Sequence, residues 1–209
     1  MNKKPMLILV AGGTGSGKTT VAYEIKKILP SHIASQIVCL DQFYKSSDGL
    51  TTEQAYETVN FDHPNAFDWE LLNQKIDNLL NGNKTELPQY DYTICKRKKE
   101  TTIVEPTDVI ILEGILSLYD QNILSKADLK IYVDTPDDER FIRRLLRDRA
   151  ERKRSDEDTI SQWRKTLRPM QRQFISPQKT EANIIIPWSK VNNIAIKAIQ
   201  GAIQEFLKK

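Results

Sequence analysis

At residues 12–19 the chain reads Gly12-Gly13-Thr14-Gly15-Ser16-Gly17-Lys18-Thr19. This stretch matches G-x-x-x-x-G-K-[ST], the pattern of a glycine-rich loop that wraps around phosphate groups. Glycines let the backbone of such a loop direct several N–H groups into one anion-sized hollow. The pattern also predicts that Lys18 contacts the outer phosphates and that the Thr19 hydroxyl ligates Mg²⁺. A nucleoside triphosphate with its magnesium ion is therefore the expected ligand.

The residues on either side of the loop favour a strand before it and a helix after it. Residues 6–10 form a continuous apolar run, as in a strand buried on both faces. Residues 18–29 carry apolar side chains at helical spacing, and the start of a helix adds the positive end of its dipole to a phosphate site. The predicted phosphate-binding residues are Gly12, Gly13, Thr14, Gly15, Ser16, Gly17, Lys18, Thr19 and Thr20.

Four further apolar runs can form strands of the same sheet. They lie at residues 36–40, 109–112, 129–133 and 183–187, and segments with helical periodicity separate them. Apolar strands that alternate with helices are typical of a parallel sheet with helices on both faces. We therefore predict an α/β fold of the P-loop NTPase type with a five-stranded parallel sheet, in a single domain that spans residues 1–209.

Three segments depart from this alternation. Aromatic and β-branched residues between about 84 and 106 predict a small β-hairpin insertion, with the basic run Lys96–Lys99 in a solvated turn. Residues 45–56 are polar, and we expect a mobile excursion there. Residues 156–174 favour a helix that Pro169 breaks or kinks.

Composition and charge narrow the class of protein. The chain has 209 residues and a net charge of +3, which is too small to argue for nucleic acid as a partner. No apolar segment approaches membrane-spanning length, so we expect no membrane association. The two cysteines, Cys39 and Cys95, do not suggest a disulfide framework and favour a reducing, cytoplasmic location.

Two acidic residues follow predicted strands directly. The carboxyl ends of parallel strands face the ligand crevice, so Asp41 and Glu113 are expected near the phosphate loop. Asp41 can act as a general base on an attacking hydroxyl, or it can simply cap a following helix. Glu113 can bind Mg²⁺ directly or through water, or it can be a plain acid at a strand end.

A basic segment follows the fourth predicted strand. Arg140, Arg144 and Arg147 recur at i, i+4 and i+7 on a predicted helix, and Arg149, Arg152, Lys153 and Arg154 come next. Read alone, this pattern is equally consistent with a solvated basic face. Beside a phosphate loop, guanidinium groups can grip phosphate oxygens, and a hinged segment can close over a triphosphate. We therefore predict an arginine-rich lid at about residues 147–165.

Taken together, the separated blocks of sequence resemble one family, the uridine kinases (uridine–cytidine kinases) of the P-loop kinases. The resemblance covers nearly the whole chain and keeps the family's order of motifs. Besides the loop at residues 12–20, it rests on residues 41–44, 60–64, 88–92, 112–116, 133–135, 143–148, 151–154 and 168–170. It implies transfer of the γ-phosphoryl group of ATP or GTP to the 5′-hydroxyl of uridine or cytidine, in a homo-oligomer (tetramer or dimer).

The resemblance also implies roles for individual residues. Asp41 looks like the catalytic base, assisted by Lys18 and by Arg147 and Arg152 from the lid, while Thr19 and Glu113, with Asp41 as a third candidate, look like the Mg²⁺ ligands. Tyr44, Phe61, Tyr90 and Tyr92 look like the wall of the nucleoside pocket. Asp62 and Arg144 look like the pair that holds the ribose hydroxyls, and Arg154 and Gln162 match positions on the nucleoside side.

Two positions depart from the family pattern. Cys95 stands where many members have a histidine that reads the edge of the base, and a thiol is a weak donor and a weak acceptor. The loss of a good partner there is expected to alter discrimination between uracil and cytosine. Trp188-Ser189-Lys190 stands where an arginine and glycines are common, which affects the nucleotide-base end or a subunit contact.

Three other functions compete with this hypothesis. The nearest is a sister kinase that acts on phosphoribulose, pantothenate or a nicotinamide riboside. A regulatory GTPase would need a late N-K-x-D motif, and the chain offers only Asn83-Lys84-Thr85-Glu86, in the wrong place and without the aspartate. An RNA-binding module would need aromatic residues interleaved with its basic residues, which residues 140–154 lack.

Overall fold

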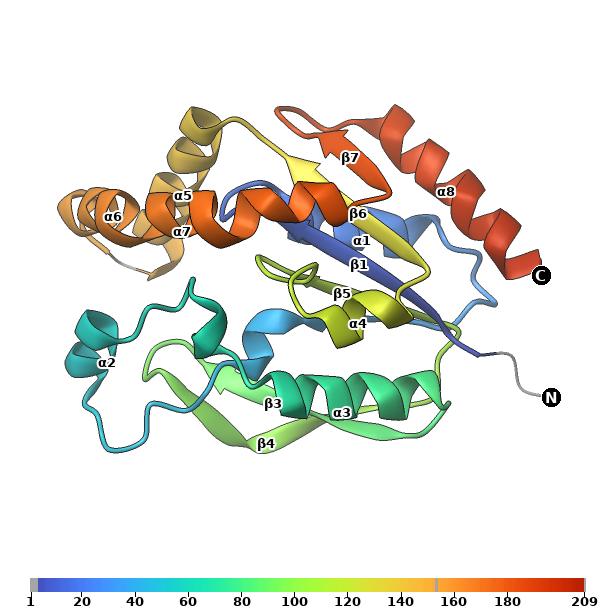
Figure 1. Cartoon of the computed structure of the whole chain (residues 1–209), viewed down its shortest axis with the longest axis horizontal. Helices are drawn as coiled ribbons and strands as arrows, with labels where there is room; N and C mark the ends of the chain where they lie inside the picture. Colours follow the sequence, from blue (N-terminus) through green and yellow to red (C-terminus); the bar gives the residue numbers. More distant parts are fainter. Residues whose placement is uncertain (1–3, 153, 209) are drawn as a thin grey trace.

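The protein folds around a parallel five-stranded sheet with the strand order β2-β5-β1-β6-β7, as the computed structural model in Figure 1 shows. The backbone is described for residues 4–152 and 154–208, and the side chains of residues 56, 57, 152 and 208 are outside the description. The strands are β1 (Met6–Gly12), β2 (Ser35–Cys39), β5 (Val109–Gly114), β6 (Leu129–Asp134) and β7 (Ile184–Pro187). All neighbouring strands in this sheet pair in parallel, which confirms the predicted fold class.

Helices cover both faces of the sheet because its central strands are apolar on both sides. On one face, Ile8 and Val10 of β1 share a core with α1 (Lys18–Ile28) and α8 (Asn193–Lys208). On the other face, Leu7 and Leu9 share a core with α3 (Trp69–Leu80) and α4 (Gln121–Lys126). No helix in the described ranges has the length and apolar character of a membrane span.

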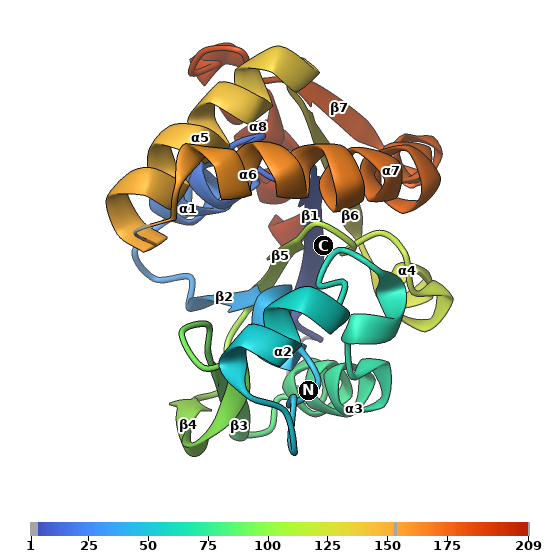
Figure 2. The ribbon, with the colours of Figure 1, turned by 90° about the vertical axis from the view of Figure 1, so that its left-hand side faces the viewer.

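The remaining elements form two groups, which Figure 2 shows at opposite ends of its view. One group holds α2 (Thr52–Thr58), η2 (Pro64–Ala66), α3 and the hairpin of β3 (Thr85–Asp91) and β4 (Lys96–Val104). The other holds α5 (Asp137–Arg152), α6 (Asp156–Gln162) and α7 (Arg168–Met170). The short turn η1 (Leu40–Phe43) leads from β2 into the first group.

The hairpin differs from expectation at its basic run. Lys96–Lys99 belongs to β4 and is not a turn, because the turn closes earlier, at Cys95, whose φ is +54°. Arg97 in this run is not simply solvated. Its Nε donates to the Tyr44 carbonyl at 3.0 Å, and its Nη2 contacts the Asp68 carboxylate at 2.9 Å. The hairpin is thereby tied to the segment that follows β2.

The polar segment 45–56 also differs from expectation, since it contains the start of helix α2. The Thr51 hydroxyl accepts a hydrogen bond from the Gln54 backbone, and the Gln54 side chain accepts one from the Thr51 backbone. This reciprocal arrangement is a capping box, and the spacing T-x-x-Q is its sequence signature. The expected mobile excursion at residues 45–56 therefore overlooked a helix start that this spacing indicates.

The helical stretch after α6 is irregular on both sides of Pro169. The chain passes through a π turn, η3 (Trp163–Leu167), then α7, a second π turn, η4 (Gln171–Ile175), and the 3₁₀ turn η5 (Ser176–Glu181). The predicted disturbance at Pro169 is present, but the chain stays helical through it. Proline has no backbone N–H to donate within a helix, and the π turns on both sides of it shift the hydrogen-bond register around that missing donor.

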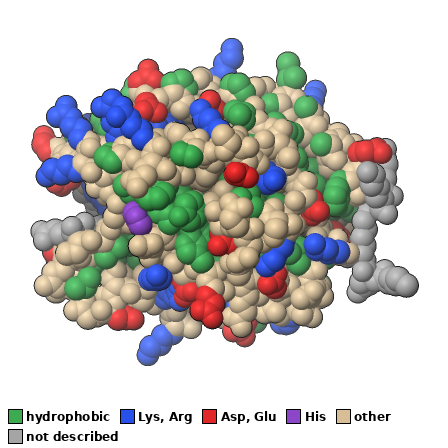
Figure 3. Space-filling view, viewed as in Figure 1, with side chains coloured by type: hydrophobic (Ala, Val, Ile, Leu, Met, Phe, Trp, Pro, Cys, Tyr) green, Lys and Arg blue, Asp and Glu red, His purple; other side chains and the backbone are tan. Residues whose placement is uncertain are grey.

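An aromatic row connects the two groups of elements on one face of the molecule. The ring of His63 meets Phe174 at 4.8 Å, Phe174 meets Tyr119 at 6.1 Å, and Tyr119 meets Trp69 at 5.7 Å. Figure 3 shows hydrophobic side chains gathered on this face beside a histidine. Aromatic pairs at these separations stabilise the contact between η4 and the segment around η2.

Candidate active site

The glycine-rich loop has the backbone that its sequence predicts. Gly15 and Gly17 have φ values of +74° and +91°, a region that residues with side chains rarely adopt. A side chain at Gly15 would also find no space, because its Cβ would strike the Arg140 backbone. Gly17 is the residue before the first residue of α1, so the loop leads directly into the helix amino terminus. Such a terminus favours a phosphate anion.

Buried side chains hold the loop in place from two sides. Arg140 and Arg144, both in α5, donate to the Thr14 carbonyl at 3.2 Å and to the Thr14 hydroxyl at 2.8 Å. The Thr135 hydroxyl, just after β6, donates to the Ser16 carbonyl at 2.9 Å. The loop is therefore fixed to β6 and α5 before any ligand arrives.

The end of the loop meets the end of β5. The Thr19 hydroxyl donates to Oε1 of Glu113 at 3.2 Å, and Glu113 is only 4% exposed. Burial raises the pKa of Glu113, with Lys18 opposing the shift and Asp41 adding to it. Oε2 of Glu113 has no hydrogen-bond partner among the described residues, which is costly for a buried carboxylate unless a ligand uses it.

Asp41 lies beside Glu113 because of strand register. Cys39 at the end of β2 pairs with Glu113 of the parallel strand β5, and the chain then turns through η1. Asp41 lies inside that turn and does not cap it, so the capping alternative is wrong. Oδ1 of Asp41 is buried without a hydrogen-bond partner in the described part of the chain. An orphaned acceptor next to a phosphate loop is available to a substrate hydroxyl.

The Thr19 and Glu113 oxygens fit a magnesium ion. Mg²⁺ prefers hydroxyl and carboxylate oxygens and usually binds with substrate phosphates and water, not inside an all-protein cage. The described residues contain no group of three or more His, Cys, Asp or Glu side chains placed to hold a metal. The unpartnered Oε2 of Glu113 is a free ligand position within this arrangement.

The predicted pocket residues gather around the buried Tyr44 ring. Phe61 meets this ring edge-on at 5.3 Å, and Tyr90 lies 5.4 Å away. Tyr92 contacts Tyr90 at 5.4 Å, and Phe67, which the sequence did not single out, stacks on Tyr44 at 4.4 Å. Four predicted residues from three segments therefore form one aromatic wall.

Polar groups border this wall. Burial raises the pKa of Tyr44 well above its usual value, and the charges of Asp41 and Asp62 add to the shift. Asp62 is 8% exposed. Cys95 is buried at the turn of the hairpin, with its sulfur 4.0 Å from the Tyr92 carbonyl. The structure thus brings the predicted base, pocket wall and hairpin cysteine to one region.

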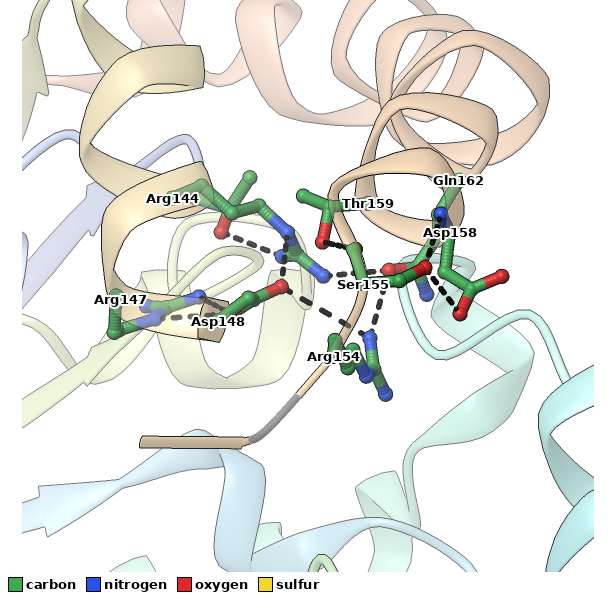
Figure 4. A network of polar contacts seen from close by, with 9 residues as sticks. Arg144, Arg147, Asp148, Arg154, Ser155, Asp158, Thr159 and Gln162 are labelled. Atoms are coloured by element: carbon green, nitrogen blue, oxygen red, sulfur yellow. Dashed lines mark hydrogen bonds and ion pairs between the residues drawn. The ribbon is translucent and has the colours of Figure 1, made fainter. Parts of the chain in front are cut away.

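The predicted arginines form a network with Asp148, which is fully buried (Figure 4). Arg144 contacts Asp148 through Nε at 3.1 Å and donates from Nη2 to Gln162 at 2.8 Å. Arg154 donates to the same Gln162 oxygen at 2.9 Å. Gln162 therefore links the end of α6 to two arginines, and a single acid neutralises much of their charge.

Of the two arginines predicted for the lid, the structure describes the side chain of Arg147 only. The Arg147 side chain is 34% exposed and contacts Asp148 at 3.2 Å. Arg152 ends α5, and its side chain lies outside the described part of the chain. Arg147 is thus within reach of solvent at the edge of the network, whereas Arg144 is buried and contacts both the loop and Gln162.

Three residues at the loop were missed as site residues from the sequence. Arg140 precedes Arg144 by one helical turn in the arginine pattern of α5, and this spacing could have indicated that both contact the loop. Gln171, at the start of a π turn, is 7% exposed, and a Cβ on Gly13 would strike its Oε1. Trp188 packs on Gly17 in the same manner. The sequence marks Trp188 only as a departure from the family pattern at the nucleotide-base end or a subunit contact, and its place after the last strand indicates the carboxyl edge of the sheet.

A phosphate loop at a helix amino terminus, with two acids at neighbouring strand ends, defines a P-loop protein that handles nucleoside triphosphates. The model of the Phosphoribulokinase / Uridine kinase family matches residues 7–195. A uridine kinase of Clostridium tetani is 47% identical over 209 residues, covering 100% of this chain and 99% of that protein. A uridine kinase of Lactobacillus helveticus is 45% identical over 205 residues, covering 98% and 97%. The chain belongs to the phosphoribulokinase/uridine kinase family.

The fold also matches solved structures at low sequence identity. D-glycerate 3-kinase from Cryptococcus neoformans superposes with a TM-score of 0.62 and is 17% identical. The match covers 85% of this chain and 82% of that one. This likeness shows the shared P-loop fold.

Proposed function

We propose that this protein transfers the γ-phosphoryl group of ATP or GTP to the 5′-hydroxyl of uridine, cytidine or both. The observation that carries the proposal is the buried, unpartnered Oδ1 of Asp41 beside Lys18 and Glu113. The identity of 45–47% to uridine kinases over at least 97% of each chain supports the choice of acceptor.

In the proposed reaction, Asp41 accepts the proton of the acceptor hydroxyl as its oxygen bonds to the γ-phosphorus. The bond from that phosphorus to the bridging oxygen breaks, and the nucleoside diphosphate leaves with the electron pair. Lys18 and the loop N–H groups neutralise charge on the phosphates. Bound Mg²⁺, held by Thr19 and Glu113 and with Asp41 as a third candidate, would supply further charge neutralisation. Positioning accounts for most of the rate, because phosphoryl transfer needs little covalent help.

The acceptor lies against the aromatic wall in this proposal. Tyr44, Phe61, Tyr90 and Tyr92 face the base and sugar, and Asp62 with Arg144 holds the ribose hydroxyls. Arg154 and Gln162 also serve the nucleoside in this proposal, and the hydrogen bond between them in Figure 4 supports a shared role. Cys95 lies at the turn of the hairpin that supplies Tyr90 and Tyr92 and takes the base-edge position.

Residues 147–165 act as a lid over the triphosphate, with Arg147 and Arg152 on the phosphates. The partial exposure of Arg147 at the edge of the network supports this role. Exclusion of water by such a closure prevents hydrolysis of the nucleotide in place of transfer.

We further propose a homo-oligomer, a tetramer or a dimer, in the cytoplasm. Exposed apolar side chains on the hairpin, Ile94 and Ile103 at 48% and 56%, support a subunit contact. Neither Cys39 nor Cys95 takes part in a disulfide among the described residues, and reduced thiols are usual in a reducing compartment. Light scattering coupled to size-exclusion chromatography measures the oligomeric state directly.

A coupled assay of ADP release tests the main proposal. The panel contains uridine, cytidine, adenosine, ribulose 5-phosphate, pantothenate and nicotinamide riboside, each with ATP and with GTP. We expect turnover with uridine or cytidine and not with the vitamin-like alcohols. Turnover only with ribulose 5-phosphate, pantothenate or the riboside would assign a sister kinase, and turnover with no member of the panel would overturn the proposal.

A further inference from the structure

Trp188 is a large apolar side chain of the core that lies directly against the phosphate loop. It follows β7 directly and is 3% exposed, and its indole packs against the backbone of Gly17. A Cβ on Gly17 would fall 2.6 Å from the indole Nε1, so the ring occupies the space beside the end of the loop. The phosphate loop and the amino terminus of α1 thus rest directly on this indole.

Other elements fix the Trp188 backbone. Its N–H donates to the Asp134 carbonyl at the end of β6, at 2.8 Å. Arg143 donates from Nη1 to the Trp188 carbonyl at 3.1 Å and from Nη2 to the Ser189 carbonyl at 2.6 Å. Glu139 accepts from Nε of the same arginine at 2.8 Å, which orients its guanidinium. The indole is therefore supported by β6 and by α5.

The Trp188 ring also belongs to the core that α1 and α8 share. That core includes Val21 and Ala22 of α1, Val133 of β6 and Ile196 of α8. The indole fills the junction between these elements and the loop. Gly17 has φ +91°, and its carbonyl accepts a hydrogen bond from the Val21 backbone at 2.9 Å. The packed ring further limits the conformations open to the end of the loop.

We infer that Trp188 is a positioning residue for the phosphate loop. By holding the loop in place, Trp188 raises the affinity for the donor nucleotide, and it does not touch the acceptor. The inference rests on the proposed kinase function, because it concerns the nucleotide bound by the loop. A loop that is already ordered loses less conformational freedom on binding, so its support adds to nucleotide affinity. Removing the ring then weakens nucleotide binding and leaves acceptor binding unchanged.

The test compares Trp188→Leu with Trp188→Phe. We measure the Kd of a non-hydrolysable ATP analogue with Mg²⁺ by titration calorimetry in the absence of acceptor, and then KM for ATP, KM for uridine and kcat. Trp188→Leu is expected to raise the Kd and the KM for ATP by about tenfold, the cost of a loop that must order on binding. KM for uridine at saturating ATP stays unchanged. Trp188→Phe keeps a ring against Gly17 and is expected to restore most of the affinity.

Ile203→Ala controls for general loss of stability. Ile203 is fully buried in the same core, on α8. This variant is expected to lower Tm while leaving the Kd of the analogue near the wild-type value. An equal rise in Kd for Ile203→Ala, or no rise for Trp188→Leu, would overturn the inference. An equal loss in Trp188→Phe would also overturn it, because the indole N–H and not packing would then be responsible. Calorimetry without acceptor keeps these outcomes separate from failure of uridine phosphorylation itself.

Discussion

The hydroxyl of Thr19 donates to Oε1 of Glu113 across 3.2 Å, which joins the end of the phosphate loop to the end of β5. Both groups are at the carboxyl edge of the sheet because β1 and β5 are parallel neighbours with Val10 paired to Glu113. The second oxygen of Glu113 is left without a partner among the described residues. This relationship leads to a prediction that depends on pH.

Glu113→Gln is expected to weaken Mg²⁺ dependence and to change how stability varies with pH. Burial raises the pKa of Glu113 above its ordinary value of 4.5. The contribution of this group to stability is therefore present below the unfolded pKa and lost as pH rises through the folded pKa. The free energy of unfolding of Glu113→Gln relative to wild type is expected to rise from pH 4.5 toward neutrality.

Urea titrations at several pH values measure this difference, and activity against magnesium concentration measures metal dependence. Protons compete with the metal for the carboxylate, so wild-type enzyme needs more Mg²⁺ as pH falls, whereas the glutamine variant loses that trend. Parallel stability curves for the two proteins would show that Glu113 does not titrate in the expected range.

Asp41→Asn is expected to lower kcat on the order of a hundredfold or more, because the amide cannot accept the hydroxyl proton. Nucleoside binding should persist, since the amide keeps the shape of the carboxylate. Steady-state kinetics with uridine and calorimetry of uridine binding measure the two effects. Asp138→Asn, at an exposed position in the first turn of α5, serves as the matched control. An unchanged kcat would remove Asp41 from the proposed chemistry.

Lys18→Ala is expected to abolish transfer, since Lys18 is the first residue of α1 and is proposed to supply the cation for the outer phosphates. Lys27→Ala, an exposed change in the same helix, controls for the loss of a positive charge. The assay is ADP release with saturating uridine. Wild-type turnover in Lys18→Ala would contradict the assignment of the phosphate loop.

Arg97→Met is expected to raise KM for the nucleoside more than KM for ATP. The substitution removes the hydrogen bond to the Tyr44 carbonyl and the ion pair with Asp68, and we expect a loss of about 1–2 kcal/mol of stability for these charged hydrogen bonds. Thermal unfolding and steady-state kinetics measure both effects. Lys99→Met, an exposed change in the same strand, should leave them unaltered. Equal changes in both KM values would show that the hairpin does not act on the acceptor alone.

Cys95→His is expected to shift the uridine-to-cytidine ratio of kcat/KM. An imidazole offers a strong donor or acceptor to the base edge, whereas a thiol offers neither. Histidine also tolerates the φ of +54° at this position better than most residues. Cys95→Ser, which adds only a small hydroxyl, is the companion variant. A ratio that stays constant in Cys95→His would show that this position does not contact the base.

The sequence predicted the parts of the fold that depend on local pattern. Apolar runs gave all five strands of the sheet, and Gly15 and Gly17 stand at positive φ, as a phosphate loop requires. The same reasoning placed Asp41 and Glu113 at one edge, because parallel strands end together. Periodicity and loop chemistry are local, so a single chain displays them without knowledge of its neighbours.

The missed features depend on contacts between distant segments. Arg97 sits in a run of charges that favours a solvated turn, and only its meeting with Tyr44 and Asp68 makes it part of the scaffold. Gln171 lies against Gly13, which is 158 residues earlier in the chain (171 − 13). Trp188 lies against Gly17, which is 171 residues earlier (188 − 17). Such contacts leave no periodic signal. Helix α2 is a different case, since its capping spacing at Thr51 and Gln54 was visible in the sequence.

The hydrogen bond from Arg97 to the Tyr44 carbonyl joins the hairpin to the segment after Asp41, while Arg140 and Trp188 contact the phosphate loop from α5 and from the end of β7. Under the proposed function, changes at the hairpin tip alter which alcohol is recognised and leave these supports of the phosphate loop in place. That division makes the hairpin the region to exchange in variants designed to accept other nucleosides.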